Sequence, residues 1–83
     1  MRLSVRYFAS IRESLGSGET VEVAPGTTLG ALRDQLIAGS ATHAKALARG
    51  RALRVALNQA LSDESTAVGE GDEVAFFPPV TGG

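Results

Sequence analysis

Hydrophobic and polar residues alternate at the start of the chain. Leu3, Val5 and Tyr7 share one parity, and the polar residues between them share the other. Because successive side chains of a strand point to opposite faces, this period of two predicts a half-buried strand over residues 1–8. The alternation returns in residues 19–23, close behind the first segment. We therefore expect the two strands to pair antiparallel.

The clearest helical pattern follows the second strand. Its apolar residues recur at intervals of three and four along one side of a helix, namely Leu29, Leu32, Leu36 and Ile37. Thr27 or Thr28 is placed to cap the N-terminus of this main helix, and Gly39 ends it. A short helix is expected over residues 9–15, and another within residues 41–50, where the pattern is weaker.

The second half of the chain predicts further strands. Residues 53–57 alternate, Asn58 and Gln59 form a turn, and residues 60–61 return briefly as a paired segment. Residues 73–77 form the last strand. The two prolines that follow end it, because proline has no backbone N–H to donate to a sheet.

The order of these elements is strand, strand, helix and then two or three strands. It predicts an α+β domain in which a mixed sheet of four or five strands packs on one main helix. This is the arrangement of the β-grasp, or ubiquitin-like, fold. We expect the domain to comprise residues 1–77, with residues 78–83 as an extended C-terminal tail.

Composition excludes several classes of function. With 83 residues, the chain is long enough for one domain but not for two. The formal net charge is -1 and there is no polybasic run, so we expect no nucleic-acid partner and no membrane contact. The absence of cysteine removes disulfide bonds, a thiolate nucleophile and cysteine-based zinc sites. No apolar N-terminal segment indicates export, so we expect a cytoplasmic protein.

The side chains form no recognisable catalytic or metal-binding group. His43 is the only histidine, and we expect it to be a solvent-exposed helix residue. Arg49, Arg51 and Arg54 form a basic cluster that we expect in a solvated loop, with contact to a partner as the alternative. We therefore expect no metal, no bound cofactor and no catalytic centre inside the domain.

The tail is the part of the chain whose composition indicates chemistry. Its residues are Pro78, Pro79, Val80, Thr81, Gly82 and Gly83. Fully extended, they span roughly 20 Å, enough to carry a carboxylate into the active site of another protein. Two residues without a Cβ fit a narrow channel and adopt backbone angles closed to other residues. Because a carboxylate is a weak electrophile, an ATP-dependent partner would have to activate Gly83 by adenylation.

Several segments resemble the small subunits of molybdopterin synthase, a family of ubiquitin-like sulfur carriers. The most specific is FFPPVTGG at residues 76–83, preceded by GDEVA at residues 71–75. LNQAL at residues 57–61 is similar to the family's segment before the last loop. Residues 7–9, with residues 12–13, resemble its first strand and the turn that follows. The resemblance covers most of the chain.

The resemblance implies a function in molybdenum cofactor biosynthesis. An adenylyltransferase related to ubiquitin-activating enzymes would form an acyl-adenylate at Gly83, and sulfur transfer would convert it to a thiocarboxylate. The tail would then enter the large subunit of molybdopterin synthase, where the sulfur attacks cyclic pyranopterin monophosphate. The chain would be the sulfur-donating, non-catalytic subunit of a heterotetramer of two small and two large subunits.

Strand parity adds an expectation about docking of the partner. If one parity of the last strand enters the core, Phe77 is exposed on the opposite face. Phe8 lies on the polar parity of the first strand, so Phe8, Phe77 and Leu61 could form an apolar docking patch near the tail. The alternative is that one or both rings lie under a loop. Arg12, in a segment that resembles the family, is the fourth residue expected to contact the partner.

Other proteins with a terminal Gly-Gly remain alternatives. A sulfur carrier for thiamine thiazole or tRNA thiolation would begin from the same adenylate, although the residues before Gly82 speak against it. A ubiquitin-like modifier would join Gly83 to lysine side chains. A binding module would leave the tail unmodified.

Overall fold

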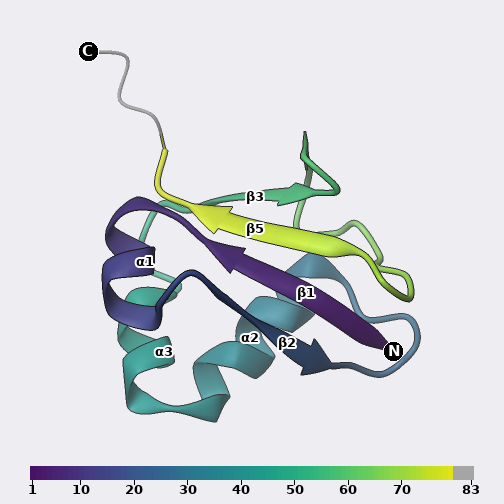
Figure 1. The fold of residues 1–83 in the computed structure, drawn as a ribbon, viewed down its shortest axis with the longest axis horizontal. Helices are drawn as coiled ribbons and strands as arrows, with labels where there is room; N and C mark the ends of the chain where they lie inside the picture. The colour runs from purple at the N-terminus through teal and green to yellow at the C-terminus, as the bar shows by residue number, and fades with distance from the viewer. Residues whose placement is uncertain (80–83) are drawn as a thin grey trace.

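The computed structural model describes residues 1–79, and in this range the chain forms five strands and three helices. In chain order they are β1 (Arg2–Tyr7), α1 (Ala9–Leu15), β2 (Gly18–Glu22), α2 (Leu29–Gly39), α3 (Ala41–Ala46), β3 (Arg54–Leu57), β4 (Ala60–Leu61) and β5 (Glu73–Phe77). The strands form one sheet in the order β2-β1-β5-β3-β4. Figure 1 shows α2 and α3 on one side of this sheet, and α1 at the end where β5 finishes.

The pairing of the strands confirms the predicted mixed sheet and the α+β class. β1 is antiparallel to β2, as expected, and parallel to β5. β5 is antiparallel to β3, which forms a short hairpin with β4. The first and last strands therefore lie side by side in the sheet, and the chain leaves the domain from the strand at its centre. This is the β-grasp arrangement.

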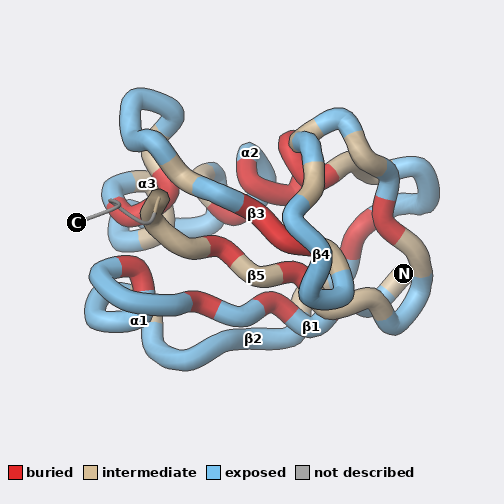
Figure 2. Tube along the Cα trace, turned by 90° about the horizontal axis from the view of Figure 1, so that it is seen from above, coloured by how far each residue is buried: buried red, intermediate tan, exposed pale blue. Residues whose placement is uncertain are grey.

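The apolar core lies between the sheet and the helices. Leu3, Val5 and Tyr7 are at most 1% exposed, and Val74 and Phe76 of β5 are equally buried. Buried and more exposed residues alternate along β1 and β5, as Figure 2 shows. The helices complete the core with Ile11, Leu29, Leu32, Leu36 and Ala46. Each fully buried large side chain contributes about 1.5–3 kcal/mol, so the alternation in the sequence is also the main stabilising pattern.

Capping residues define where the helices begin. Thr28 precedes α2, and its side chain accepts a hydrogen bond from the backbone N–H of Ala31 at 3.1 Å. Ser40 separates α2 from α3 and accepts one from the N–H of His43 at 3.0 Å. α3 ends before Leu47, whose side chain is completely buried. The short helix predicted within residues 41–50 is present, but it begins and ends earlier than its apolar residues indicate.

A tight turn and a close backbone approach position the strands. Asn58 and Gln59 have φ angles of 50° and 71°, the left-handed pair that a two-residue hairpin loop requires. The side-chain amide of Asn58 donates to Asp72 at 3.1 Å and accepts from the N–H of Glu73 at 2.9 Å, which ties this turn to the start of β5. At Gly18, a Cβ would lie 2.4 Å from the carbonyl oxygen of Val5, so only glycine fits there.

The prediction for His43 is wrong. Its side chain is only 22% exposed, and Nε2 lies 2.7 Å from Oε2 of Glu19 on β2. The Tyr7 hydroxyl donates to the same oxygen at 2.7 Å, and Ser40 Oγ lies 2.6 Å from Nδ1 of His43. His43 is half-buried because α3 lies over the edge of the sheet, so the imidazole connects the helix to the edge strand.

These contacts shift two pKa values in opposite directions. Burial raises the pKa of the Tyr7 hydroxyl, and the neighbouring Glu19 carboxylate raises it further. Burial acts to raise the pKa of Glu19 as well, but the hydrogen bonds from His43 and Tyr7 outweigh it and the pKa is lowered. Tyr7 therefore stays a neutral donor and Glu19 an ionised acceptor at neutral pH.

The basic cluster of Arg49, Arg51 and Arg54 was expected in a solvated loop, and this is only partly correct. Arg49 pairs with Asp34 at 2.9 Å, and its guanidinium also contacts Glu64 and the carbonyl oxygen of Gly30. The hydrogen bond from Arg49 lowers the pKa of Glu64, against a raising effect of burial. Arg51 donates to the carbonyl oxygen of Ala46 at 3.1 Å. These arginines hold the loop after α3 onto the body of the domain.

A buried arginine, absent from the residues predicted to be functional, forms the centre of this network. Arg33 is 4% exposed and donates to the carbonyl oxygens of Leu47 and Ala48 at 2.8 and 2.6 Å, and to Glu64 at 2.9 Å. Its position follows Leu29 by four residues and so lies on the apolar side of α2. The sequence did contain a signal for this site, namely a charged residue on the apolar side of α2. A buried charge needs hydrogen-bonding partners, so such a residue indicates a buried polar network.

Candidate functional site

The tail begins at the centre of the sheet. β5 ends at Phe77 between β1 and β3, and Pro78 and Pro79, both half-buried, follow it. Because neither proline can donate a backbone hydrogen bond, the sheet cannot continue along this segment. Every helix in residues 1–79 is too short or too polar to span a bilayer.

The residue expected to carry the chemistry, Gly83, is the last of the tail segment. Val80, Thr81, Gly82 and Gly83 lie outside the described residues. The role expected of Gly83, and the boundary between domain and tail, therefore stay predictions. The described site is the root of the tail and the surface around it.

The sheet face opposite the helices carries the apolar residues that were expected to dock a partner. Leu61 lies opposite Ala56 in the β3–β4 pair, and Ala56 lies opposite Ala75 in the β3–β5 pair. Phe77 follows on the same parity of β5, and the N–H of Phe8 bonds to β5 at the carbonyl oxygen of Phe76, so that Phe8 is beside the end of that strand. We call Phe8, Ala56, Leu61, Ala75 and Phe77 the outer patch.

Exposure within the outer patch is uneven. Leu61 is 66% exposed and Phe8 is 38% exposed, and these are the exposed large hydrophobic residues of the described part of the chain. Val74 and Phe76 enter the core, as the parity argument requires, but Phe77 is half-buried rather than fully exposed. The patch nevertheless leaves apolar surface open beside the tail.

Charged residues border the outer patch. The guanidinium of Arg6 lies 5.8 Å from the centre of the Phe8 ring, and Arg6 also pairs with Glu73 at 3.9 Å. Arg54 lies opposite Phe77 in the β3–β5 pair and is exposed. Arg12 is exposed on α1, one turn beyond Phe8. An apolar centre with a polar rim is the usual composition of a protein–protein interface.

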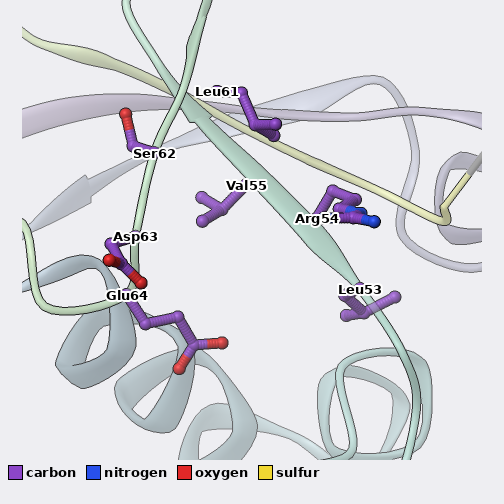
Figure 3. Close-up of a pocket in the computed structure, with 7 residues that line it drawn as sticks. All are labelled: Leu53, Arg54, Val55, Leu61, Ser62, Asp63 and Glu64. Carbon is purple, nitrogen blue, oxygen red and sulfur yellow. The ribbon is translucent and has the colours of Figure 1, made fainter.

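An open groove continues the outer patch over the edge of the sheet. It has a volume of about 400 Å³ and is lined by Leu53, Arg54, Val55, Leu61, Ser62, Asp63 and Glu64. Figure 3 shows Arg54 and Leu61 on one side of β3, and Val55 with residues 62–64 on the other. The groove is shallow and opens to solvent, so it suits a side chain of a partner better than an enclosed small molecule.

Comparison with known proteins identifies relatives over the whole chain. The model of the ThiS family matches residues 5–83. The molybdopterin synthase sulfur carrier subunit of Escherichia coli (strain K12) is 44% identical over 81 residues, which are 98% of this chain and 99% of that protein. The match of the family model includes residues 80–83, which lie beyond the described residues.

Solved structures match the fold over the same length. Subunits 1 and 2 of molybdopterin-converting factor from Helicobacter pylori form a protein–protein complex that contains a chain with a TM-score of 0.69 and 28% identity, covering 100% of both chains. The small archaeal modifier protein 1 of Haloferax volcanii has a TM-score of 0.77 and 28% identity, covering 95% of this chain and 98% of that one. The ubiquitin-like β-grasp fold predicted from the order of elements is confirmed.

Proposed function

Because the chain belongs to the ThiS family, we propose that it is the sulfur carrier subunit of molybdopterin synthase, with Gly83 as the residue that carries the sulfur. The observation that carries this proposal is the full-length similarity to sulfur carrier subunits, at 44% identity for the Escherichia coli relative. The sequence FFPPVTGG of residues 76–83 adds the chemical group, a carboxylate at the end of a segment without bulky side chains.

Activation is the first step of the proposed mechanism. A carboxylate oxygen of Gly83 attacks the α-phosphate of ATP in an adenylyltransferase partner, which gives an acyl-adenylate and releases pyrophosphate. A persulfide or sulfide donor then attacks the acyl carbon, and AMP leaves with the electron pair of the broken C–O bond. A persulfide donor gives an acyl disulfide, and a second thiol of the donor then attacks the donor's sulfur. This breaks the S–S bond, releases the thiocarboxylate and leaves the donor oxidised to a disulfide. The product is a thiocarboxylate on Gly83.

Delivery is the second step. The thiocarboxylate enters the large subunit of molybdopterin synthase, where its sulfur forms a C–S bond with cyclic pyranopterin monophosphate as a C–O bond of the pterin breaks. Water then hydrolyses the resulting thioester, which leaves the sulfur on the pterin and returns Gly83 as a carboxylate. The large subunit supplies the acid and base groups, and this chain supplies no catalytic side chain and binds no cofactor of its own. The subunit complex from Helicobacter pylori supports a large-subunit partner. We place the reaction in the cytoplasm, with a heterotetramer of two small and two large subunits as the working assembly.

The outer patch gives this delivery a docking site. Its apolar residues lie at the root of the tail, so a partner that covers Phe8, Leu61 and Phe77 holds the first proline of the tail at a fixed point. Pro78 and Pro79 stiffen the next segment and reduce the conformational entropy lost when the tail enters a channel. Arg12 lies on α1 beside this surface and is included in the proposed contact.

Mass spectrometry of the intact protein tests the carrier role. After incubation with the adenylyltransferase, ATP and a sulfur donor, we expect a mass gain equal to the exchange of one oxygen for one sulfur. The control is a variant that lacks Gly83, which should gain no mass. An unchanged mass, with the adenylyltransferase active on another carrier, would contradict the proposal.

A ubiquitin-like modifier is the second candidate, supported by the similarity to the small archaeal modifier protein 1. The two functions share the adenylate and differ in the acceptor. A product in which Gly83 is joined to a lysine of another protein, formed without a sulfur donor, would favour this candidate. A carrier for thiamine thiazole or tRNA thiolation would give the same thiocarboxylate but no molybdopterin with the large subunit.

A further inference from the structure

The chain offers very few amines to another molecule. Lys45 is its only lysine, and the other basic side chains apart from His43 are arginines, whose guanidinium groups stay protonated and are not nucleophiles. The second amine is the α-ammonium group of Met1. It donates to the carbonyl oxygen of Val23 at 2.7 Å and lies 3.8 Å from the carboxylate of Glu22. Because these contacts hold the Met1 amine in its charged form against the sheet, Lys45 is the open amine of this chain.

Lys45 is placed on α3 so that its side chain is available. It is exposed, and no ion pair within residues 1–79 involves it. His43, two residues earlier, contacts Glu19 at the edge of the sheet. Since helix residues two apart do not face the same way, Lys45 is directed away from that edge.

The side of α3 that carries Lys45 borders an open groove beside α1. The groove has a volume of about 460 Å³ and is lined by Ser14, Ala41, Thr42, Lys45, Ala46 and Arg51. Figure 1 shows α1 and α3 at the same end of the molecule. The lining consists of small or hydroxyl-bearing side chains and two cations, and no described residue that lines the groove is acidic. We call it the Lys45 groove.

Arg51 gives this groove a positioned cation. Its Nη1 donates to the carbonyl oxygen of Ala46 at 3.1 Å, and its Nη2 lies 3.5 Å from the hydroxyl of Ser10. No carboxylate within residues 1–79 forms an ion pair with Arg51. A guanidinium fixed in this way, with donors to spare, suits the oxygens of a phosphate group.

An amine beside a phosphate-binding cation is suited to accept an acyl group that a phosphate activates. The proposed function produces such a group, the acyl-adenylate of Gly83, which carries a negative phosphate directly on the acyl carbon. Gly82 and Gly83 have no side chains, so this end of the chain fits a shallow groove without a clash. The charge and the shape of the acyl-adenylate therefore both match the Lys45 groove.

We propose that Lys45 is an acylation site, and that it accepts the activated carboxyl group of Gly83 from a second copy of this chain when no sulfur donor is present. This inference rests on the proposed function, because it uses the same acyl-adenylate. The unprotonated Nζ of Lys45 attacks the acyl carbon and forms a C–N bond. The C–O bond to the phosphate breaks, AMP leaves with its electron pair, and the proton from nitrogen passes to water. The product is a dimer joined by an isopeptide bond.

Mass spectrometry of the intact protein and of its peptides tests this site. The protein is incubated with the adenylyltransferase and ATP, without a sulfur donor. We expect a species of twice the monomer mass less one water, and a Lys45 peptide that carries the C-terminal end of a second chain. A sulfur donor should suppress this dimer, since sulfur transfer consumes the acyl-adenylate.

Two single variants separate the amine from the cation. Lys45→Arg keeps the positive charge but removes the nucleophile, so it should form no dimer and should still exchange oxygen for sulfur at Gly83. Arg51→Gln keeps the amine and should lower the dimer yield about tenfold, the loss of roughly one charge-assisted hydrogen bond. An unchanged urea midpoint for Arg51→Gln would show that the lower yield reports the groove rather than the fold.

Ala31→Lys combined with Lys45→Arg is the matched control. Ala31 is exposed on α2 and does not line the groove, so this double variant again has one open lysine on a helix. It should form the dimer about tenfold less than the wild-type protein, because its amine has no cation beside it to position the phosphate.

Four results would overturn the inference. They are a dimer that persists in Lys45→Arg, an equal yield from the Ala31→Lys control, a monomer that loses one water because its own tail reaches Lys45, and no dimer at all. Exchange of pyrophosphate into ATP and exchange of sulfur for oxygen at Gly83 are measured in parallel. If both are normal, the proposed function stands whatever Lys45 does, whereas their loss in the wild-type protein would remove the function itself.

Discussion

The two faces of the sheet are built from the same strands and yet serve different ends. One face carries Val5, Val74 and Phe76, which are at most 1% exposed beneath the helices. The other carries the outer patch, where Phe8 and Leu61 remain open. Apolar residues on this sheet therefore act in two ways. Those beneath the helices stabilise the fold, and those on the open face leave surface free for a partner.

Charged side chains also differ in burial between the two faces. On the helix side, the charged side chain of Arg33 is buried and its hydrogen bonds are satisfied by carbonyl oxygens and Glu64. On the open face, Arg54 stands exposed beside Phe77. A satisfied buried charge positions loops, whereas an unpaired exposed charge is available for recognition.

The largest difference is expected between two neighbouring phenylalanines. Phe76→Ala removes a ring that is 1% exposed and should lower the free energy of unfolding by about 3–5 kcal/mol. Phe77→Ala should lower it by about 1 kcal/mol, because the ring is already half open. Urea denaturation measures both values. Phe77→Ala should nevertheless weaken binding to the large subunit, and unimpaired binding would place the docking site elsewhere.

The next difference concerns the guanidinium groups. Arg33→Met keeps the apolar stem and removes the donors to Leu47, Ala48 and Glu64, so we expect a loss of about 2–4 kcal/mol. Arg54→Met should change the free energy of unfolding by less than about 0.5 kcal/mol. Thermal or urea unfolding would distinguish the two. Similar losses in both variants would mean that Arg54 supports the fold, contrary to its exposure.

A smaller difference is expected between two glycines. Gly18→Ala places a Cβ 2.4 Å from the carbonyl oxygen of Val5 and should destabilise the protein by about 1–3 kcal/mol as β2 shifts away from β1. Gly39 ends α2, and a Cβ there would have no atom within 4 Å. Gly39→Ala should therefore stabilise the protein by about 0.5–1 kcal/mol. A destabilised Gly39→Ala variant would contradict the open environment of that helix end.

The smallest effect is a dependence of stability on pH. The pKa of Glu64 is lowered in the folded state, chiefly by its hydrogen bond from Arg49, and that of Glu19 is lowered by His43 and Tyr7 against the effect of burial. Their stabilisation is complete above the unfolded value of about 4.3 and is lost as the pH falls through the lower folded values.

Urea midpoints measured from about pH 6 down to about pH 3 test this dependence. Glu64→Gln should flatten the decline, because the glutamine does not titrate. Glu13→Gln is the control, since Glu13 is exposed and forms no ion pair within residues 1–79. An unchanged decline in Glu64→Gln would show that other groups determine acid unfolding.

Local patterns were sufficient to predict most of the elements. The alternation of Leu3, Val5 and Tyr7, the stripe of leucines in α2 and the turn at Asn58 each lie within a few residues of sequence, and each is present in the structure. Strand parity predicted an open position for Phe8 and Phe77, and Phe8 is 38% exposed whereas Phe77 is half-buried. Leu61, which was named with them as part of the docking patch, is 66% exposed. Their role in binding remains a prediction.

Predictions failed where a side chain depends on a segment far away in the chain. His43 was expected in solvent, but its partner Glu19 is 24 residues away on β2. Arg33 reaches Glu64, which is 31 residues away. Neither contact leaves a periodic signal, because the pairing depends on which surfaces the sheet and helices bring together.

The sequence by itself determined which residues face inward, since strand and helix periods are local properties of the backbone. It also contains the Gly82-Gly83 motif on which the proposed chemistry of the tail rests, because that motif is local in the sequence. The tertiary structure decided where that tail leaves the domain. Only the parallel pairing of β1 with β5 places Phe8 and Phe77 together, and only the antiparallel pairing of β3 with β5 adds Arg54 beside them. These neighbours depend on the register between strands that are distant in the sequence. The register is fixed because only one alignment of the strands buries all of the core residues.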